Sequence, residues 1–204
     1  MITVIDYGMG NLRSVQKAFE LFYPDIRISS VVEDILSSDK IVLPGVGAFG
    51  KAMDELRKRN LVNAIIDVIK KGTPFMGICL GLQLLFTESE EGGAVGGLGI
   101  LKGKVRRFSE DGGLKVPHMG WNKIKSEIRN PKSEILKNIP DGSFMYFVHS
   151  YYVEPEDKDV VLCETGYGLS FASGVNKDNV CGFQFHPEKS QKQGLEIIKN
   201  FVEL

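Results

Sequence analysis

The sequence predicts an α/β fold in which a doubly wound parallel sheet is extended by antiparallel strands in the second half of the chain. In the first half, short apolar strands alternate with stretches of helical periodicity, which is typical of a parallel sheet covered by helices. From about Leu98 to Phe185 the chain consists of short β-rich segments, and an amphipathic stretch ends it. We therefore expect binding loops at the carboxyl edge of a parallel sheet.

The elements of the first half follow from apolar spacing and from the residues that interrupt it. The expected order is a strand over residues 2–5, a helix over 12–22, a strand over 26–32, a strand over 40–43 that stops at Pro44-Gly45, a helix over 61–69 that ends at Gly72, and a strand that leads to Cys79. A turn and a helix carrying Leu82, Leu84, Leu85 and Phe86 should follow Cys79.

The second half is predicted to be mostly β-structure. The expected strands cover residues 104–108, 120–125, 144–153, 160–164, 169–175 and 180–185, and a closing helix covers 195–202. The 204 residues, of which 43% are hydrophobic, are enough for one globular domain with a sizeable core. We therefore expect residues 1–204 to form a single domain.

Composition excludes several classes of function. The formal net charge is −1, so nothing steers the chain towards nucleic acid or an anionic membrane. No run of about 18 apolar residues predicts a membrane span, and we expect no leader ahead of the first strand. The three cysteines form neither a disulfide framework nor a metal-binding pattern, so we expect no metal and no cofactor. A cytoplasmic location, where thiols stay reduced, is the expected one.

The most informative segment is 77–83, which reads Gly-Ile-Cys-Leu-Gly-Leu-Gln. An apolar run leads into Cys79, glycines stand two residues before and after it, and a second apolar run follows. A nucleophile raised on a sharp strand-to-helix turn needs small neighbours at these two positions. At a helix N-terminus the thiolate is stabilised by free amides and the helix dipole. Cys163 and Cys181, on apolar strands, are predicted only to pack, as most lone cysteines do.

A catalytic cysteine needs a base and a group that orients the base, and the chain has three histidines. His186 is followed by Pro187 and Glu188, so a carboxylate two residues on can hold one ring nitrogen while the other faces the thiol. The sequence favours His186 as the base and predicts a structural role for His118.

The segments 77–83 and 183–188 together resemble the paired signatures of the class I, triad-type glutamine amidotransferases. Their order and separation suit that domain. The resemblance implies a flavodoxin-like sheet and a catalytic triad of Cys79, His186 and Glu188.

Five further segments, at residues 5–12, 43–49, 117–122, 147–151 and 187–190, are similar to the glutaminase-subunit family of imidazole glycerol phosphate synthase. This similarity covers essentially the whole chain. It implies L-glutamine as the substrate and a (β/α)₈-barrel cyclase as the partner in a heterodimer. The ammonia would pass to the cyclase, which makes imidazole glycerol phosphate and aminoimidazole carboxamide ribotide in histidine biosynthesis.

The developing oxyanion of glutamine hydrolysis needs preorganised donors. The geometry of the turn predicts that the backbone N–H of Leu80 is one of these donors. The loop at Gly45-Val46-Gly47, whose glycines allow a peptide flip, could supply a second donor or could be a tight turn only. In the resembled family this loop is the oxyanion strand, which implies that role for Val46 and Gly47. The resemblance also implies that the glutamine pocket is lined by Gly47, Gln83, His149, Ser150 and Tyr151.

The resemblance further places Trp121 at the edge that docks on the partner. A sole tryptophan is more often a core residue, so the residues alone favour packing. Met9, Gly10 and Asn11 are expected on the same face, the alternative being a glycine loop that caps the first helix at Asn11. The glycine-rich stretch 91–99 lacks the pattern of a phosphate loop, and Gly8-x-Gly10 lacks the third glycine of a dinucleotide fingerprint.

Two other readings stay open at the level of sequence. The chain could be a paralogous glutaminase that supplies ammonia to another acceptor, for example a sugar-modifying enzyme, because the triad motifs do not identify the acceptor. It could also be a non-catalytic regulator that keeps the fold for docking. The complete set of Cys79, His186 and Glu188 argues against the regulator.

Overall fold

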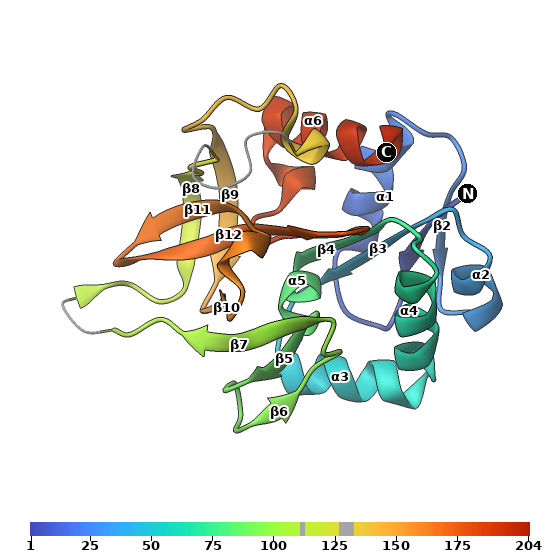
Figure 1. The fold of residues 1–204 in the computed structure, drawn as a ribbon, viewed down its shortest axis with the longest axis horizontal. Coiled ribbons are helices and arrows are strands. Elements are labelled where there is room, and N and C mark those ends of the chain that lie inside the picture. Colours follow the sequence, from blue (N-terminus) through green and yellow to red (C-terminus); the bar gives the residue numbers. More distant parts are fainter. Residues whose placement is uncertain (111–112, 127–132) are drawn as a thin grey trace.

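The computed structural model of the protein describes residues 1–110, 113–126 and 133–204 (Figure 1). Among these residues, one sheet has eleven strands in the order β2-β1-β3-β4-β13-β12-β10-β7-β5-β6, with β11 paired to β12. Strands β8 and β9 form a separate two-stranded sheet. The predicted combination of a parallel sheet with an antiparallel extension is confirmed.

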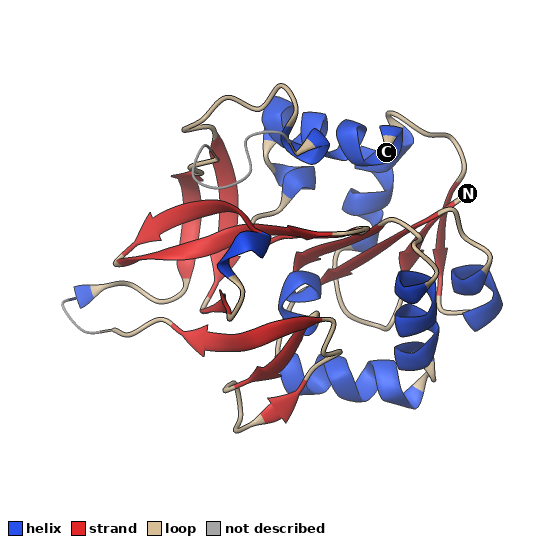
Figure 2. Ribbon diagram, viewed as in Figure 1, coloured by secondary structure: helices blue, strands red, loops and turns tan. Residues whose placement is uncertain are grey.

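The parallel part of the sheet consists of β1 (Ile2–Ile5), β2 (Ile26–Ser29), β3 (Lys40–Gly45), β4 (Phe75–Cys79) and β13 (Val180–Phe183). The helices are α1 (Leu12–Glu20), α2 (Val32–Leu36), α3 (Phe49–Lys58), α4 (Leu61–Lys70), α5 (Leu80–Leu84) and α6 (Gln191–Glu203). Helices α1 and α6 cover one face of the sheet, and α3 and α4 lie on the other (Figures 1 and 2). The resulting order β2-β1-β3-β4 is that of flavodoxin-like folds.

The extension contains β5 (Phe86–Ser89), β6 (Val95–Gly96), β7 (Leu101–Arg107), β10 (Tyr151–Pro155), β11 (Val161–Tyr167) and β12 (Leu169–Lys177). The separate sheet pairs β8 (His118–Lys123) with β9 (Phe144–His149) antiparallel. Three 3₁₀ turns are described, η2 (Glu134–Leu136), η3 (Lys158–Val160) and η4 (Pro187–Lys189). Strand β12 joins the two parts, because it pairs antiparallel with the last parallel strand, β13.

Several predicted boundaries were wrong. The strand expected over 26–32 ends at Ser29, and Val32 begins α2. The helix expected to reach Phe86 stops at Leu84, because Phe86 already pairs in β5. The strand expected over 144–153 is two strands, since the chain leaves the small sheet at His149 and joins the main sheet at Tyr151. The helix α3 was not predicted, although Phe49, Ala52, Met53 and Leu56 form its buried face at helical spacing.

The register of the parallel strands decides where the functional residues meet. Gly45 at the end of β3 stands opposite Cys79 at the end of β4. On the other side, Phe183 at the end of β13 stands opposite Ile78. Parallel strands bring their carboxyl ends to one edge, so residues that are distant in sequence are neighbours there.

Candidate active site

Cys79 occupies a strained backbone conformation at the junction of β4 and α5. Its φ is 55° and its ψ is −106°, a region that non-glycine residues avoid. The backbone leaves the strand at this residue and enters the helix at Leu80. The sharp strand-to-helix turn that the sequence predicted is therefore present at Cys79.

The glycines beside Cys79 are required by close backbone contacts. A Cβ on Gly81 would lie 1.7 Å from the carbonyl oxygen of Leu43, and a Cβ on Gly77 would lie 2.8 Å from the backbone of Gly81. Real Cβ atoms do not approach so closely, so no other residue fits at either position without moving β3 or α5. The steric requirement inferred from the sequence is confirmed.

His186 and Glu188 follow β13 and lie beside β4. The Nδ1 atom of His186 is 2.8 Å from Oε1 of Glu188, and both side chains are almost fully buried. The backbone holds the ring in place, because the N–H of His186 donates to the carbonyl of Tyr146 at 2.9 Å and its carbonyl accepts from the hydroxyl of Ser190 at 2.7 Å. Among the described residues the Nε2 atom has no hydrogen-bond partner, so this nitrogen is free to exchange a proton.

The electrostatics favour a protonated His186. Burial by itself lowers the pKa of this ring, but Cys79 and Glu188 outweigh burial and raise its pKa to about 10. An imidazolium between a carboxylate and a thiol is the arrangement of a nucleophile–base–orienting group triad. The structure thus brings the three predicted catalytic residues together.

A cavity of about 360 Å³ opens in front of Cys79. Its lining includes every residue expected in the glutamine pocket or the oxyanion hole, namely Val46, Gly47, Leu80, Gln83, His149, Ser150 and Tyr151. These residues come from the loop after β3, from α5 and from the junction of β9 and β10. The size and the mixture of backbone and side-chain groups suit a small amino-acid side chain.

The loop after β3 has a backbone conformation that favours glycine. Gly47 has a φ of +98°, which only glycine adopts freely. A Cβ at Gly47 would lie 2.9 Å from the end of the Met9 side chain, and one at Gly10 would lie 3.7 Å from Gly45. The segment Met9–Gly10 therefore packs directly against the loop that was expected to bind the oxyanion.

Two polar residues at the site were missed from the sequence. Gln184 is fully buried, and its Nε2 atom lies 3.7 Å from Sγ of Cys79. Its signal was its position in an apolar segment, between Phe183 at the end of β13 and Phe185, where a glutamine needs partners. Glu91 lines the cavity and accepts a hydrogen bond from the backbone N–H of Phe49 at 2.8 Å. It begins the stretch 91–99, which contributes a carboxylate to the pocket although it is no phosphate loop.

The other predicted residues lie as follows. Cys163 and Cys181 are buried free thiols in the core, and burial raises the pKa of both, that of Cys163 to about 12. Asn11 caps α1, since its side chain accepts from the N–H of Ser14 at 3.3 Å. Trp121 is 46% exposed on β8, so the core position that its residue type favoured is wrong.

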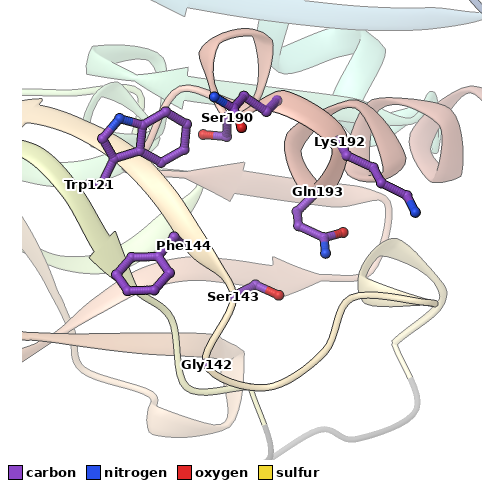
Figure 3. Close-up of a pocket in the computed structure, with 8 residues that line it drawn as sticks. Trp121, Gly142, Ser143, Phe144, Ser190, Lys192 and Gln193 are labelled. Carbon is purple, nitrogen blue, oxygen red and sulfur yellow. The ribbon is translucent and has the colours of Figure 1, made fainter.

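Trp121 borders a second cavity, of about 520 Å³, which Cys79 does not reach (Figure 3). The rings of Trp121 and Phe144 stand on one side, and Lys192 and Gln193 from the start of α6 stand on the other. Ser190, which binds the carbonyl of His186, forms part of its wall. This hydrogen bond places one wall of the cavity next to the backbone of His186.

Comparison with known families agrees with this geometry. The family described as "Glutamine amidotransferase class-I" matches residues 3–204. The chain belongs to the class-I glutamine amidotransferase family. Its fold is that of the family as well. A crystal structure of a glutamine amidotransferase aligns over 100% of this chain and 98% of its own with a TM-score of 0.77 at 17% identity. The structure of PurLQS from Thermotoga maritima aligns over 99% of this chain and 97% of its own, with a TM-score of 0.75 at 20% identity.

Relatives within this family share about half of the sequence. The "Imidazole glycerol phosphate synthase subunit HisH" of Aquifex aeolicus is 54% identical over 97% of this chain and 94% of its own length. The subunit of the same name from Methanocaldococcus jannaschii is 52% identical over the full length of both chains.

Among the residues that the structure describes, no helix is both long and apolar enough to cross a membrane.

Proposed function

We propose that this chain is the glutaminase subunit of an imidazole glycerol phosphate synthase. It hydrolyses L-glutamine to glutamate and ammonia and passes the ammonia to a (β/α)₈-barrel cyclase bound as a heterodimer. The observation that carries the proposal is the buried pair of His186 and Glu188, 2.8 Å apart, beside a strained Cys79 that opens into a pocket of amino-acid size. The full-length similarity to HisH subunits supports the choice of acceptor.

The first step is attack of the Cys79 thiolate on the side-chain amide carbon of glutamine. The new carbon–sulfur bond moves an electron pair onto the amide oxygen, which needs donors at that moment. Leu80, Val46 and Gly47 line the same pocket, so their backbone N–H groups are the candidate donors. Because Gly47 has a positive φ, the Val46–Gly47 peptide can turn its N–H towards the oxygen at low cost.

The tetrahedral species then collapses with proton transfer from His186. The imidazolium gives its proton to the amide nitrogen, the carbon–nitrogen bond breaks, and ammonia leaves a thioester on Cys79. Neutral His186 next takes a proton from water, the hydroxide adds to the thioester, and the carbon–sulfur bond breaks. Glutamate is released, and the thiolate–imidazolium pair is restored.

Groups at the pocket wall account for recognition of glutamine. The carboxylate of Glu91 lines the cavity and suits the α-ammonium group of the substrate. The side chain of Gln83 donates to the carbonyl of Tyr151 at 3.0 Å, which fixes the wall opposite Cys79. Ser150 and His149 complete this wall.

The partner follows from the fate of ammonia, which becomes unreactive ammonium in bulk water. The exposed side chains of Met119 and Trp121 on β8, together with the 9–11 segment beside the oxyanion loop, form the proposed docking face. Contact at that segment would set the position of the loop at Gly47, so the isolated subunit should hydrolyse glutamine slowly.

We place the enzyme in the cytoplasm, where its three free thiols remain reduced.

The test is glutamate release by the chain alone and mixed with a barrel cyclase of the histidine pathway. We expect stimulation by the cyclase and no release by the Cys79→Ala variant in the same complex. Undiminished release by that variant would refute the mechanism. Turnover without any stimulation or co-purification of the cyclase would instead indicate a paralogue with another acceptor.

A further inference from the structure

Two buried histidines meet edge-on at the wall of the glutamine pocket and take no part in the proposed proton transfers. His118 on β8 and His149 on β9 are directly opposite each other in the small sheet, and they are 3% and 6% exposed. The Nδ1 atom of His118 lies 2.9 Å from the Nε2 atom of His149. At this distance one nitrogen carries a proton and the other accepts it, so the tautomers of the two rings depend on each other.

The groups at the two ends of the pair decide which nitrogen carries the proton. The Nδ1 atom of His149 is 2.8 Å from the carbonyl oxygen of Tyr151. A carbonyl only accepts, so Nδ1 of His149 bears the proton, and its Nε2 must accept from His118. At the other end, the Nε2 atom of His118 then accepts from the amide nitrogen of Asn122 at 3.2 Å.

The orientation of the Asn122 amide is itself fixed. Its oxygen accepts from the N–H of Lys123 at 2.8 Å, and its nitrogen also donates to the carbonyl of Gly166 at 2.9 Å. Both rings are thus assigned as neutral and protonated at Nδ1. Burial lowers the pKa of His118 to about 4 and that of His149 to about 3, which agrees with this assignment.

The same carbonyl of Tyr151 connects the histidine pair to the nucleophile. It accepts a second hydrogen bond from Nε2 of Gln83 at 3.0 Å. That nitrogen also donates to the side-chain oxygen of Gln184 at 3.1 Å, and the amide nitrogen of Gln184 lies 3.7 Å from Sγ of Cys79. A continuous series of hydrogen bonds therefore leads from Asn122 on β8 to the thiol.

We propose that His118 is a positioning residue for the glutaminase reaction. Its ring, oriented by Asn122, fixes His149 as the Nδ1–H tautomer, and His149 then holds the Tyr151 carbonyl against which Gln83 and Gln184 are aligned with Cys79. With its Nε2 occupied by His118, His149 is unable to act as a base, and His186 is left as the ring that exchanges protons with substrate. The kinetic part of this inference rests on the proposed function.

Nitrogen NMR of the full chain tests the tautomers without any assay of activity. Because the chain has three histidines, a ¹⁵N-histidine-labelled sample gives three pairs of ring signals, assigned by single substitutions. We expect the rings of His118 and His149 to be neutral at pH 6.5, each with the proton on Nδ1. A proton on Nε2 of His149, or a charged ring at either position, would overturn the proposal.

Three variants in complex with the cyclase test the kinetic role. His118→Leu removes the donor to His149, and we expect the kcat of glutamine hydrolysis to fall about tenfold, since small misplacements of reacting groups are costly. His118→Asn puts an amide donor near the former Nδ1 and should restore most of kcat. Phe171→Leu is the matched control, because the Phe171 ring packs with its centroid 6.0 Å from that of His118 and 5.3 Å from that of His149, through contacts that are not hydrogen bonds.

The outcomes separate positioning from packing. The proposal requires that Phe171→Leu leaves the Nδ1–H signals in place and keeps kcat within about threefold. It is wrong if His118→Leu leaves kcat unchanged, or if Phe171→Leu costs as much as His118→Leu while His118→Asn restores nothing. Absence of glutamate release by the wild-type complex would refute the proposed function, and the NMR assignment of the two rings would still decide the tautomer inference.

Discussion

Two residues of the candidate active site are held in states that their residue type disfavours. Cys79 has a positive φ, and the pKa of His186 is raised to about 10 although the residue is 3% exposed. Both conditions cost free energy in the absence of compensating neighbours. The compensation comes from packed glycine backbone around Cys79 and from the carboxylate of Glu188 beside His186.

The strain at Cys79 is measurable by substitution. Glycine adopts a φ of 55° and a ψ of −106° more readily than alanine does. Cys79→Gly should therefore unfold at higher urea concentration than Cys79→Ala, with a free energy of unfolding about 1 kcal/mol larger. An alanine variant at least as stable as the glycine variant would show that the turn stores no strain.

The charge on His186 predicts how stability depends on pH. The pKa of the ring is about 10 in the folded chain, against 6.5 for an unperturbed histidine, so its stabilisation is complete below pH 6.5 and is lost as the pH rises through 10. Glu188→Gln removes the carboxylate that, together with Cys79, raises the pKa of His186. Between pH 6 and pH 10 the wild-type chain should exceed this variant in free energy of unfolding by a margin that shrinks steadily.

Urea titrations at several pH values measure this margin, with Glu203→Gln on the exposed end of α6 as the control. Glu203 is 61% exposed, so its replacement should shift stability by a small amount that does not depend on pH in this range. A margin for Glu188→Gln that stays constant from pH 6 to pH 10 would contradict a raised pKa of His186.

At the scale of elements, the site is assembled at the ends of three parallel strands. Strands β3, β4 and β13 lead to the proposed oxyanion loop, the proposed nucleophile and the proposed base, in that spatial order. The small sheet of β8 and β9 adds the wall with His149. The order and register of these strands therefore determine the distances between the reacting groups.

Close packing of α5 against β3 predicts unequal effects of glycine substitutions. Gly81→Ala should destabilise the chain by at least about 3 kcal/mol, because its Cβ would overlap the carbonyl of Leu43. Gly96→Ala in β6 is the control, since its Cβ meets no atom within 4 Å, and it should change stability by less than about 0.5 kcal/mol. Thermal unfolding of both variants measures the difference, and equal midpoints would contradict the packing at α5.

At the scale of the whole molecule, the two faces of β8 have different roles because side chains alternate along a strand. His118 and Asn122 point inward to the hydrogen-bond series, whereas Met119 and Trp121 are exposed. The exposed face is the one proposed to bind the cyclase. The proposed docking face and the hydrogen bonds that reach the glutamine pocket thus lie on one short strand.

Replacing Trp121 tests the docking face. Trp121→Ala should leave the stability of the isolated chain within about 1 kcal/mol, since its ring is 46% exposed. The dissociation constant for the cyclase should rise at least about tenfold, because truncation of an aromatic side chain that anchors an interface commonly weakens binding by that much. Leu21→Ala is the control, because Leu21 is 65% exposed at the opposite end of α1 from Asn11. Equal affinities of both variants would exclude Trp121 from the interface.

Local pattern was enough for part of the site and insufficient for the rest. The glycines around Cys79 and the sequence His186-Pro187-Glu188 express their geometry within a few residues, so both were predicted. Gln184 and Glu91 were missed because their partners, Cys79 and the amide of Phe49, are distant in sequence. The break at Ser150 between β9 and β10 was also missed, because it depends on pairing partners that are distant in sequence. Strand β9 pairs within the small sheet and β10 within the main sheet.

Apolar periodicity and short motifs were sufficient to predict the class of fold and the family, and to propose a nucleophile with its base, because each of these depends on a few neighbouring residues. Folding was needed to establish that Trp121 is exposed, that Gln184 reaches the thiol, and that His118 and His149 form a coupled neutral pair. Those facts depend on strand order and register, which are set by long-range pairing and leave no local pattern.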